Sequence, residues 1–176
     1  VGIGTTTITA STSNGKTAKV NVKIAKTLKK GDLINIKVNN KDVIPFYVIQ
    51  DSPVDETDVN VYMAYSIAYS TFTDRNTVLE NNTSDWVVKP HIITKEELTT
   101  TFFKCGSGSA SDRTDCPKWL GYSTTLKKSE HVWTDTPWSS SYAYYTGYYQ
   151  YLDYTSNSTE LGIRPVMKIN KKYITE

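Results

Sequence analysis

The sequence predicts a β-dominant α+β protein. Apolar and polar residues alternate in several short runs, and turn-forming pairs such as Asn-Gly, Gly-Asp and Asn-Asn separate these runs. Only residues 94–104 carry a strong helix signal. The chain has 176 residues, of which 38% are apolar and 22% charged. This length accommodates one well-packed domain and a fragment of another.

The first two predicted strands are residues 7–12 and 17–24, and Asn14-Gly15 lies between them. Asn-Gly predicts a two-residue hairpin turn, because both central positions of that turn need a positive φ. A lone hairpin is marginal in water, so these strands either join the sheet of the following domain or belong to another domain. The segment GTTTITASTSNGKTAKVNVKI resembles the last two strands of the bacterial Ig-like group 2 domain. The resemblance implies that residues 1–25 are a partial Ig-like domain from a longer bacterial surface protein.

Residues 26–176 form the predicted main domain, which begins with three strands at 33–38, 43–50 and 59–64. Consecutive strands joined by short turns predict a meander. The acidic loop at residues 51–58 offers the oxygen ligands that calcium prefers, but its spacing does not match an EF-hand. We therefore assign no metal to this loop.

A helix is predicted over residues 95–104. Thr94 and Glu97 have the spacing of a capping box, in which each side chain bonds the other residue's backbone amide. Leu98, Phe102 and Phe103 follow on one face. The rest of the chain is rich in loops until a tyrosine-rich hairpin and a final strand at residues 164–169.

The tyrosine-rich hairpin is the most distinctive feature, because seven tyrosines fall within residues 142–154. A turn at Thr146-Gly147 would pair Tyr145 with Tyr148 and Tyr144 with Tyr149. Alternation then places one set of side chains toward the core: Ala143, Tyr145, Tyr148, Gln150 and Leu152. The opposite face would carry Tyr142, Tyr144, Tyr149 and Tyr151, together with Asp153. This face is either a ligand surface or a set of cross-strand aromatic pairs that stabilise the hairpin.

The segments beside the hairpin set tryptophans among Ser, Thr and Asn, as in WTDTPWSSS before it and TSNST after it. Large rings among small polar residues are typical of antibody loops that bind ligands. Trp133 is equally compatible with a core position. The candidate ligand-binding residues are Trp133, Trp138, Tyr142, Tyr144, Tyr149, Tyr151, Tyr154 and Asn157.

Cys105 and Cys116 bracket a Gly/Ser/Asp-rich loop that has few residues able to form a core. A disulfide between them would restrict the unfolded chain by ~3 kcal/mol and is typical of an oxidising, extracellular setting. A reduced pair or a thiolate metal site is the alternative, although two cysteines alone do not complete a tetrahedral zinc site.

The order of motifs in residues 26–173 resembles the formylglycine-generating-enzyme-like branch of the C-type lectin fold. The motifs are a Gly-Asp strand, Phe-Tyr-Val-Ile, Ile-Thr-Lys-Glu-Glu, a Trp-containing loop, Tyr-Thr-Gly and Gly-Ile-Arg-Pro-Val-Met. The resemblance implies a C-type-lectin-like scaffold that presents loops to a ligand, as in adhesins and the variable proteins of diversity-generating retroelements. It also implies that Gly162 and Arg164 lie on an internal strand, where Arg164 is structural. The enzymes of that group depend on a reactive cysteine pair near the carboxyl terminus, and no cysteine follows Cys116 here.

Composition and motifs narrow the function further. A net charge of +2 is too small for a nucleic-acid footprint, and no apolar run approaches the ~20 residues that span a bilayer. His91 and His131 are the only histidines, and no nucleophile motif accompanies them. The sequence predicts a non-catalytic, extracellular adhesion module of a bacterial cell surface or phage particle, without a cofactor. Its partner would be a protein or glycan on another cell surface. The alternatives are an oxidoreductase or hydrolase related to formylglycine-generating enzymes, and a structural spacer or filament subunit.

Overall fold

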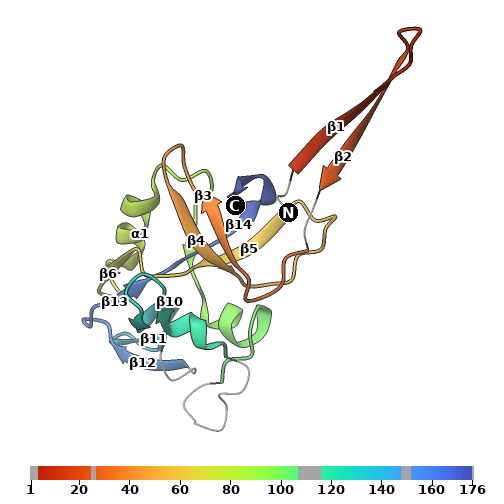
Figure 1. The fold of residues 1–176 in the computed structure, drawn as a ribbon. Coiled ribbons are helices and arrows are strands. Elements are labelled where there is room, and N and C mark those ends of the chain that lie inside the picture. The colour runs from red at the N-terminus through yellow and green to blue at the C-terminus, as the bar shows by residue number, and fades with distance from the viewer. Residues whose placement is uncertain (1–3, 25–26, 107–115, 148–151, 176) are drawn as a thin grey trace.

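The computed structural model describes residues 4–24, 27–106, 116–147 and 152–175. Within these residues the strands form a six-stranded sheet, a five-stranded sheet and two separate two-stranded hairpins (Figure 1). Helical segments are few and short, which confirms the β-dominant α+β class.

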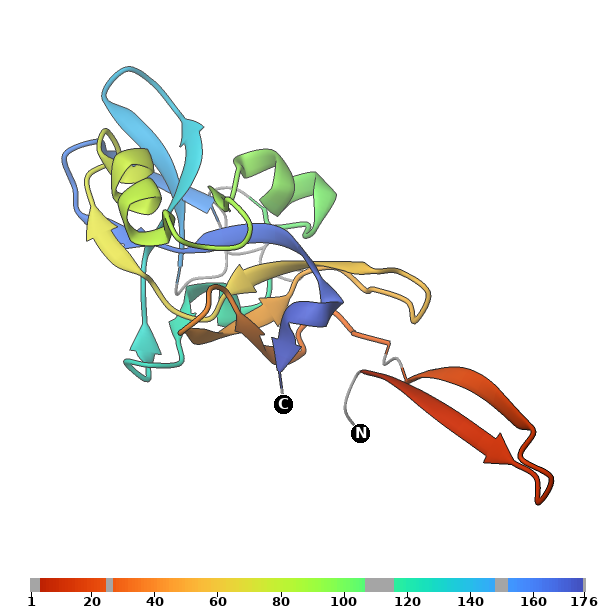
Figure 2. The same cartoon turned by 90° about the horizontal axis from the view of Figure 1, so that it is seen from above.

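The amino-terminal hairpin consists of β1 (Gly4–Ser11) and β2 (Thr17–Ile24). It pairs only with itself among the described strands and extends away from both larger sheets (Figures 1 and 2). The predicted hairpin is confirmed, but its connection is longer than the two-residue turn that Asn14-Gly15 indicates: Ser11 pairs with Thr17, and the backbone amide of Thr12 donates to the carbonyl of Lys16 over 2.9 Å. Gly15 has a φ of +80°, the left-handed conformation that glycine adopts most readily. The proposed origin of this hairpin in an Ig-like domain stays a prediction.

The six-stranded sheet contains the predicted meander β3 (Leu33–Lys37), β4 (Val43–Val48) and β5 (Asp58–Met63). Its strand order is β15-β3-β4-β5-β14-β7, where β7 is His91–Ile92, β14 is Pro165–Asn170 and β15 is Ile174–Thr175. Alternate residues of these strands point into one apolar core, in which Phe46, Val61 and Met63 are fully buried.

The five-stranded sheet has the order β12-β11-β10-β13-β6. These strands are β6 (Ala68–Ser70), β10 (Val132–Pro137), β11 (Tyr142–Thr146), β12 (Leu152–Ser156) and β13 (Leu161–Ile163). Arg164 alone separates β13 from β14. The chain therefore passes from one large sheet to the other at this residue, and the final strand begins close to its predicted position.

The capping box at Thr94 and Glu97 is confirmed. The backbone amide of Thr94 donates to Glu97 Oε2 over 2.8 Å, and the amide of Glu97 donates to Thr94 Oγ1 over 3.1 Å. The helical turns that follow include η1 (Glu97–Thr101), so the helix ends slightly earlier than predicted. The sequence did not predict the helix α1 (Arg75–Thr83), which lies beside β6 (Figure 1). The remaining short elements are β8 (Tyr122–Ser123), β9 (Lys128–Ser129), η3 (Lys118–Gly121) and η4 (Lys171–Tyr173).

Glu97 also pairs with His91, whose Nε2 lies 2.9 Å from Glu97 Oε1. This hydrogen bond raises the pKa of His91 above its ordinary value. Partial burial by itself would raise the pKa of Glu97, but the hydrogen bonds from His91 and Thr94 outweigh it and the pKa lies below its ordinary value. The pair is therefore fully charged between the ordinary values of 4.5 for the carboxyl and 6.5 for the imidazole.

We expect this pair to make stability depend on pH. Its contribution is complete below pH 6.5, where both folded and unfolded His91 are protonated, and is lost as the pH rises through the raised pKa of folded His91. At the acid end it is lost as the pH falls through the lowered pKa of Glu97. Because the pair is partly exposed, its loss should lower the melting temperature by only roughly 2 °C. Thermal melts at pH 5.5, about one unit below the ordinary imidazole pKa of 6.5, and at pH 8 should show this difference in the parent and His131→Gln proteins but not in His91→Gln. An unchanged pH dependence in His91→Gln would contradict the assignment.

None of the helices among the described residues has the length and apolar character needed to cross a membrane.

Candidate ligand-binding surface

The register of the tyrosine-rich hairpin differs from the predicted one. Tyr144 pairs with Tyr154, Tyr145 with Asp153, and Thr146 with Leu152. Because Thr146 is a strand residue paired with Leu152, the predicted two-residue turn at Thr146-Gly147 is wrong. Asp153 lies opposite Tyr145 and accepts a hydrogen bond from its hydroxyl over 3.3 Å, so it does not share the face of Tyr142 and Tyr144 as predicted. The predicted ligand residues Tyr149 and Tyr151 lie outside the described residues.

Three of the predicted ligand residues, Trp138, Tyr142 and Tyr154, lie together and are exposed. We call these three side chains the aromatic platform. The rings of Trp138 and Tyr154 stack with centroids 4.2 Å apart and an angle of 11° between their planes. Tyr142 stands nearly perpendicular to both, with its centroid 6.0 Å from each. The exposed fractions are 49% for Trp138, 42% for Tyr142 and 47% for Tyr154, which are high for rings in mutual contact.

Backbone hydrogen bonds position the platform. The pairing of β10 with β11 shifts register between Trp133 and Pro137, and the next two amides, of Trp138 and Ser139, both donate to the carbonyl of Tyr142 over 2.9 Å. This turn places the ring of Trp138 beside the ring of Tyr142. Tyr154 lies opposite Tyr144 on the neighbouring strand, so it is a diagonal same-face neighbour of Tyr142. The three rings therefore meet because of strand register and one tight turn.

Tyr144 borders the platform but is only partly exposed. Its ring packs against the buried cluster that contains Leu152. Its hydroxyl accepts a hydrogen bond from Lys95 Nζ over 3.0 Å, and the same ammonium lies 4.2 Å from the ring centroid. Tyr144 thus joins the start of the helix to the hairpin, and it places one lysine at the border of the platform.

Trp133 is not part of the surface. Its side chain is completely buried, its indole N–H donates to the carbonyl of Ser70 over 2.8 Å, and it packs edge-on against Phe72. This burial contradicts its predicted role as a ligand contact and shows the core position that the sequence left open. The sequence does not show the register of β10, which directs Trp133 into the core and leaves Trp138, just after the strand, at the surface.

Asn157 holds the two loops beside the platform together. Its side-chain amide donates to the carbonyl of Ser140 over 3.1 Å, and its backbone amide donates to the carbonyl of Ser141 over 2.9 Å. Its Oδ1 atom is buried and has no hydrogen-bond partner among the described residues. Asn157 therefore supports the loop geometry, whereas its predicted ligand contact stays a prediction.

A buried ion pair lies at Arg164, where the chain crosses from one large sheet to the other. Arg164 is fully buried and donates from Nη2 to Glu130 Oε2 over 2.7 Å and from Nη1 to the carbonyl of Leu120 over 3.1 Å. Glu130 also accepts hydrogen bonds from the hydroxyls of Ser66 at 2.9 Å and Tyr69 at 2.5 Å. The sequence located Arg164 but not Glu130, Ser66 or Tyr69, because these residues carry no local motif.

The electrostatics of this cluster follow from its contacts. Burial by itself would raise the pKa of Glu130, but hydrogen bonds from Tyr69 and Arg164 outweigh it and hold the pKa below its ordinary value. Burial and the hydrogen bond to Glu130 together raise the pKa of Tyr69 to about 12. The carboxylate is therefore charged and the phenol neutral at physiological pH.

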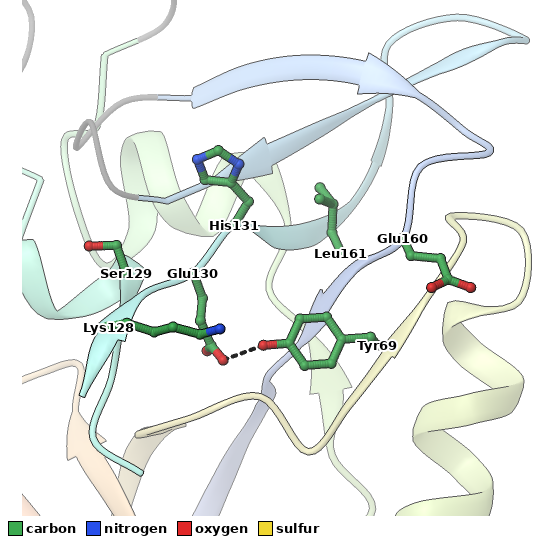
Figure 3. A pocket seen from close by; sticks show the side chains of 7 residues that line it. All are labelled: Tyr69, Lys128, Ser129, Glu130, His131, Glu160 and Leu161. Carbon is green, nitrogen blue, oxygen red and sulfur yellow. Dashed lines mark hydrogen bonds between the residues drawn. The ribbon is translucent and has the colours of Figure 1, made fainter. Parts of the chain in front are cut away.

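A pocket of about 260 Å³ lies beside this cluster. Figure 3 shows the Tyr69 hydroxyl directed at Glu130 in its lining. Its remaining lining is Lys128, Ser129, His131, Glu160 and Leu161. The carboxylate of Glu130 is occupied by its structural partners, so it is not poised as a general base. Gly162 is required nearby, because a Cβ there would lie 2.1 Å from Ser66 Oγ.

The disulfide between Cys105 and Cys116 is confirmed, with the two Cα atoms 4.6 Å apart. Both cysteines are buried in the cluster that contains Phe103 and Leu120. Neither is a free thiol available for nucleophilic or metal chemistry. Among the described residues, no group of three or more His, Cys, Asp or Glu side chains is arranged to hold a metal ion.

Comparison of the chain with protein-family models, curated proteins and solved structures finds no match.

Proposed function

We propose that this chain is a non-catalytic, extracellular binding module of a bacterial or phage surface protein, and that the aromatic platform is its binding site. One observation carries the proposal: Trp138, Tyr142 and Tyr154 form a preassembled cluster whose rings are each nearly half exposed. Exposed aromatic anchors that lose little side-chain entropy on binding are typical of recognition surfaces. The C-type-lectin-like fold of the formylglycine-generating-enzyme-like branch, with adhesion as its role, belongs to the same proposal.

The arrangement of the molecule supports this function. The strands β11 and β12, which carry the platform, lie at the opposite end from the β1–β2 hairpin in both views (Figures 1 and 2). Binding at that end would leave the β1–β2 hairpin clear of the ligand. The disulfide agrees with an extracellular location, because such bonds persist in oxidising compartments. It also argues against the oxidoreductase alternative, which needs free thiols.

The proposal predicts that the platform governs attachment to cells. Fluorescently labelled protein should bind a subset of bacterial or animal cells in flow cytometry. The double change Trp138→Ala/Tyr154→Ala should weaken this binding at least tenfold, because truncated aromatic anchors typically cost 2 kcal/mol or more.

The matched control is Tyr122→Ala, which removes a tyrosine that is 40% exposed outside the platform. This variant should bind as the parent protein does, and both variants should keep the parent melting temperature to within a few degrees. Equal binding by the parent and the double variant would exclude the platform as the site.

A further inference from the structure

We infer that the ligand of the aromatic platform is a neutral carbohydrate, which stacks the C–H face of a pyranose ring on Trp138 or Tyr154. This inference rests on the proposed binding function and adds the chemical class of the ligand. Four properties of the platform support it: its ring geometry, its lack of charge, its hydroxyl-rich surroundings and its area.

The ring geometry favours a flat, apolar ligand face. In a stack with a 4.2 Å spacing and an 11° interplanar angle, each ring covers one face of the other. The second face of each ring is not covered by that partner, which agrees with the high exposure of Trp138 and Tyr154. The face of an aromatic ring is electronegative and attracts polarised C–H groups. No ligand fits between rings at this spacing, so the stack does not form a cage around a cation.

The charge around the platform favours a neutral ligand. Residues 136–152 and 154–159 contain no Asp, Glu, Lys or Arg. Two charged groups beside the hairpin are engaged in hydrogen bonds: Asp153 accepts from the Tyr145 hydroxyl, and Lys95 donates to the Tyr144 hydroxyl. A polyanion such as a nucleic acid or a sulfated glycan would need several basic side chains to neutralise it.

The polar groups around the rings are mainly hydroxyls. Ser139, Ser140, Ser141 and Ser158 are exposed beside the platform, and the hydroxyls of Ser156 and Ser158 lie 2.9 Å apart. A serine hydroxyl both donates and accepts hydrogen bonds, so it can bond sugar hydroxyls in either direction. A pyranose presents an apolar C–H face and hydroxyl groups around its edge. An aromatic ring bordered by serine hydroxyls is complementary to both.

The area of the platform favours a small ligand over a protein. Large aromatic side chains have roughly 150–250 Å² of surface, and these three expose nearly half of theirs, which gives about 300 Å². A standard protein–protein interface buries about 800 Å² on each partner. The rings alone do not supply such an interface, whereas they are large enough to contact the faces of a short oligosaccharide.

The test is an NMR titration of the full 176-residue chain with cellotetraose, chitotetraose and lactose as neutral probes and polygalacturonate as an acidic probe. Trp138→Phe identifies the indole N–H signal of Trp138. We expect at least one neutral probe to shift this signal in a saturable manner at millimolar concentration. Trp138→Ala/Tyr154→Ala should weaken binding of that probe at least tenfold, as followed by the remaining backbone amide shifts, and Tyr122→Ala should leave it unchanged.

The outcomes separate this inference from the proposed function. If no neutral probe shifts the Trp138 signal, or if the acidic probe binds more tightly, the carbohydrate inference is overturned. If the parent protein still attaches to cells whose surface sugars have been oxidised by periodate, and the platform variants do not, the ligand is a protein. The carbohydrate inference is then overturned and the binding function remains. If a neutral probe binds equally well to the double variant, the platform is not the sugar site and the inference is again overturned.

Discussion

Replacing Arg164 with leucine should destabilise the protein by about 3–5 kcal/mol, because it leaves the buried carboxylate of Glu130 without its cation. For a chain of this length the melting temperature should fall by roughly 10 °C. Arg164→Lys should be only slightly better tolerated, since an ammonium does not reproduce the separate bonds from Nη1 to Leu120 and from Nη2 to Glu130. Urea denaturation followed by tryptophan fluorescence measures these changes.

The double variant Arg164→Leu/Glu130→Leu provides the control. Once both charges are removed no uncompensated charge is buried, so the double variant should be more stable than Arg164→Leu alone. A double-mutant cycle should then give a coupling free energy of about 1–3 kcal/mol. If the loss of stability in the double variant equals the sum of the losses in Arg164→Leu and Glu130→Leu, the coupling free energy is zero. The ion pair would then contribute nothing beyond the size of its side chains.

Trp133→Ala should have an effect of similar size, about 3–5 kcal/mol, because it removes the largest fully buried side chain of the five-stranded sheet and leaves a cavity. Trp133→Phe should cost less, since it keeps an aromatic ring beside Phe72 but leaves the carbonyl of Ser70 without its indole partner. Urea unfolding midpoints measure both losses.

Trp138→Ala is the matched comparison, because Trp138 lies five positions further along and is 49% exposed. Its loss of stability should stay below about 1 kcal/mol. If Trp138→Ala unfolds the protein as readily as Trp133→Ala, the platform is part of the core and the binding proposal fails.

Strand positions were predictable from the sequence where one face of a strand is buried. The alternation in β3, β4 and β5 reflects a sheet with an apolar core on one side, and the predicted meander follows from it. The capping box was also predictable, because Thr94 and Glu97 act through backbone groups within one turn. These signals are local, so they survive without knowledge of the rest of the fold.

The helix α1 was not predictable in the same way. Its sequence, RNTVLENNT, has few apolar residues, and only Leu79 and Thr83 are buried. Asn and Thr are poor helix formers, so neither propensity nor periodicity indicates this helix. Its position depends instead on contacts distant in sequence, such as the ion pair of Arg75 with Asp135.

The hairpin register was missed because Gly147 serves a different purpose from the predicted one. A Cβ at Gly147 would lie 2.5 Å from His131 Cδ2 and 2.8 Å from the carbonyl oxygen of Glu130. Gly147, which follows β11, therefore permits a close approach to the segment just before β10, and it does not form a two-residue turn. The sequence identified Trp138, Tyr142 and Tyr154 as candidates, but only the register brings their rings together.

Main-chain hydrogen bonds position the platform, and packing of its side chains into the core does not. Trp138 and Ser139 are held through their backbone amides, and the neighbouring loop is held through the amide of Asn157. None of the three platform side chains belongs to a buried cluster. If the platform is the binding site, as we propose, replacing one of its rings by a different side chain would change the ligand while the scaffold keeps its stability. A binding module built in this way would be suited to acquiring new specificities, whether by natural variation or by design.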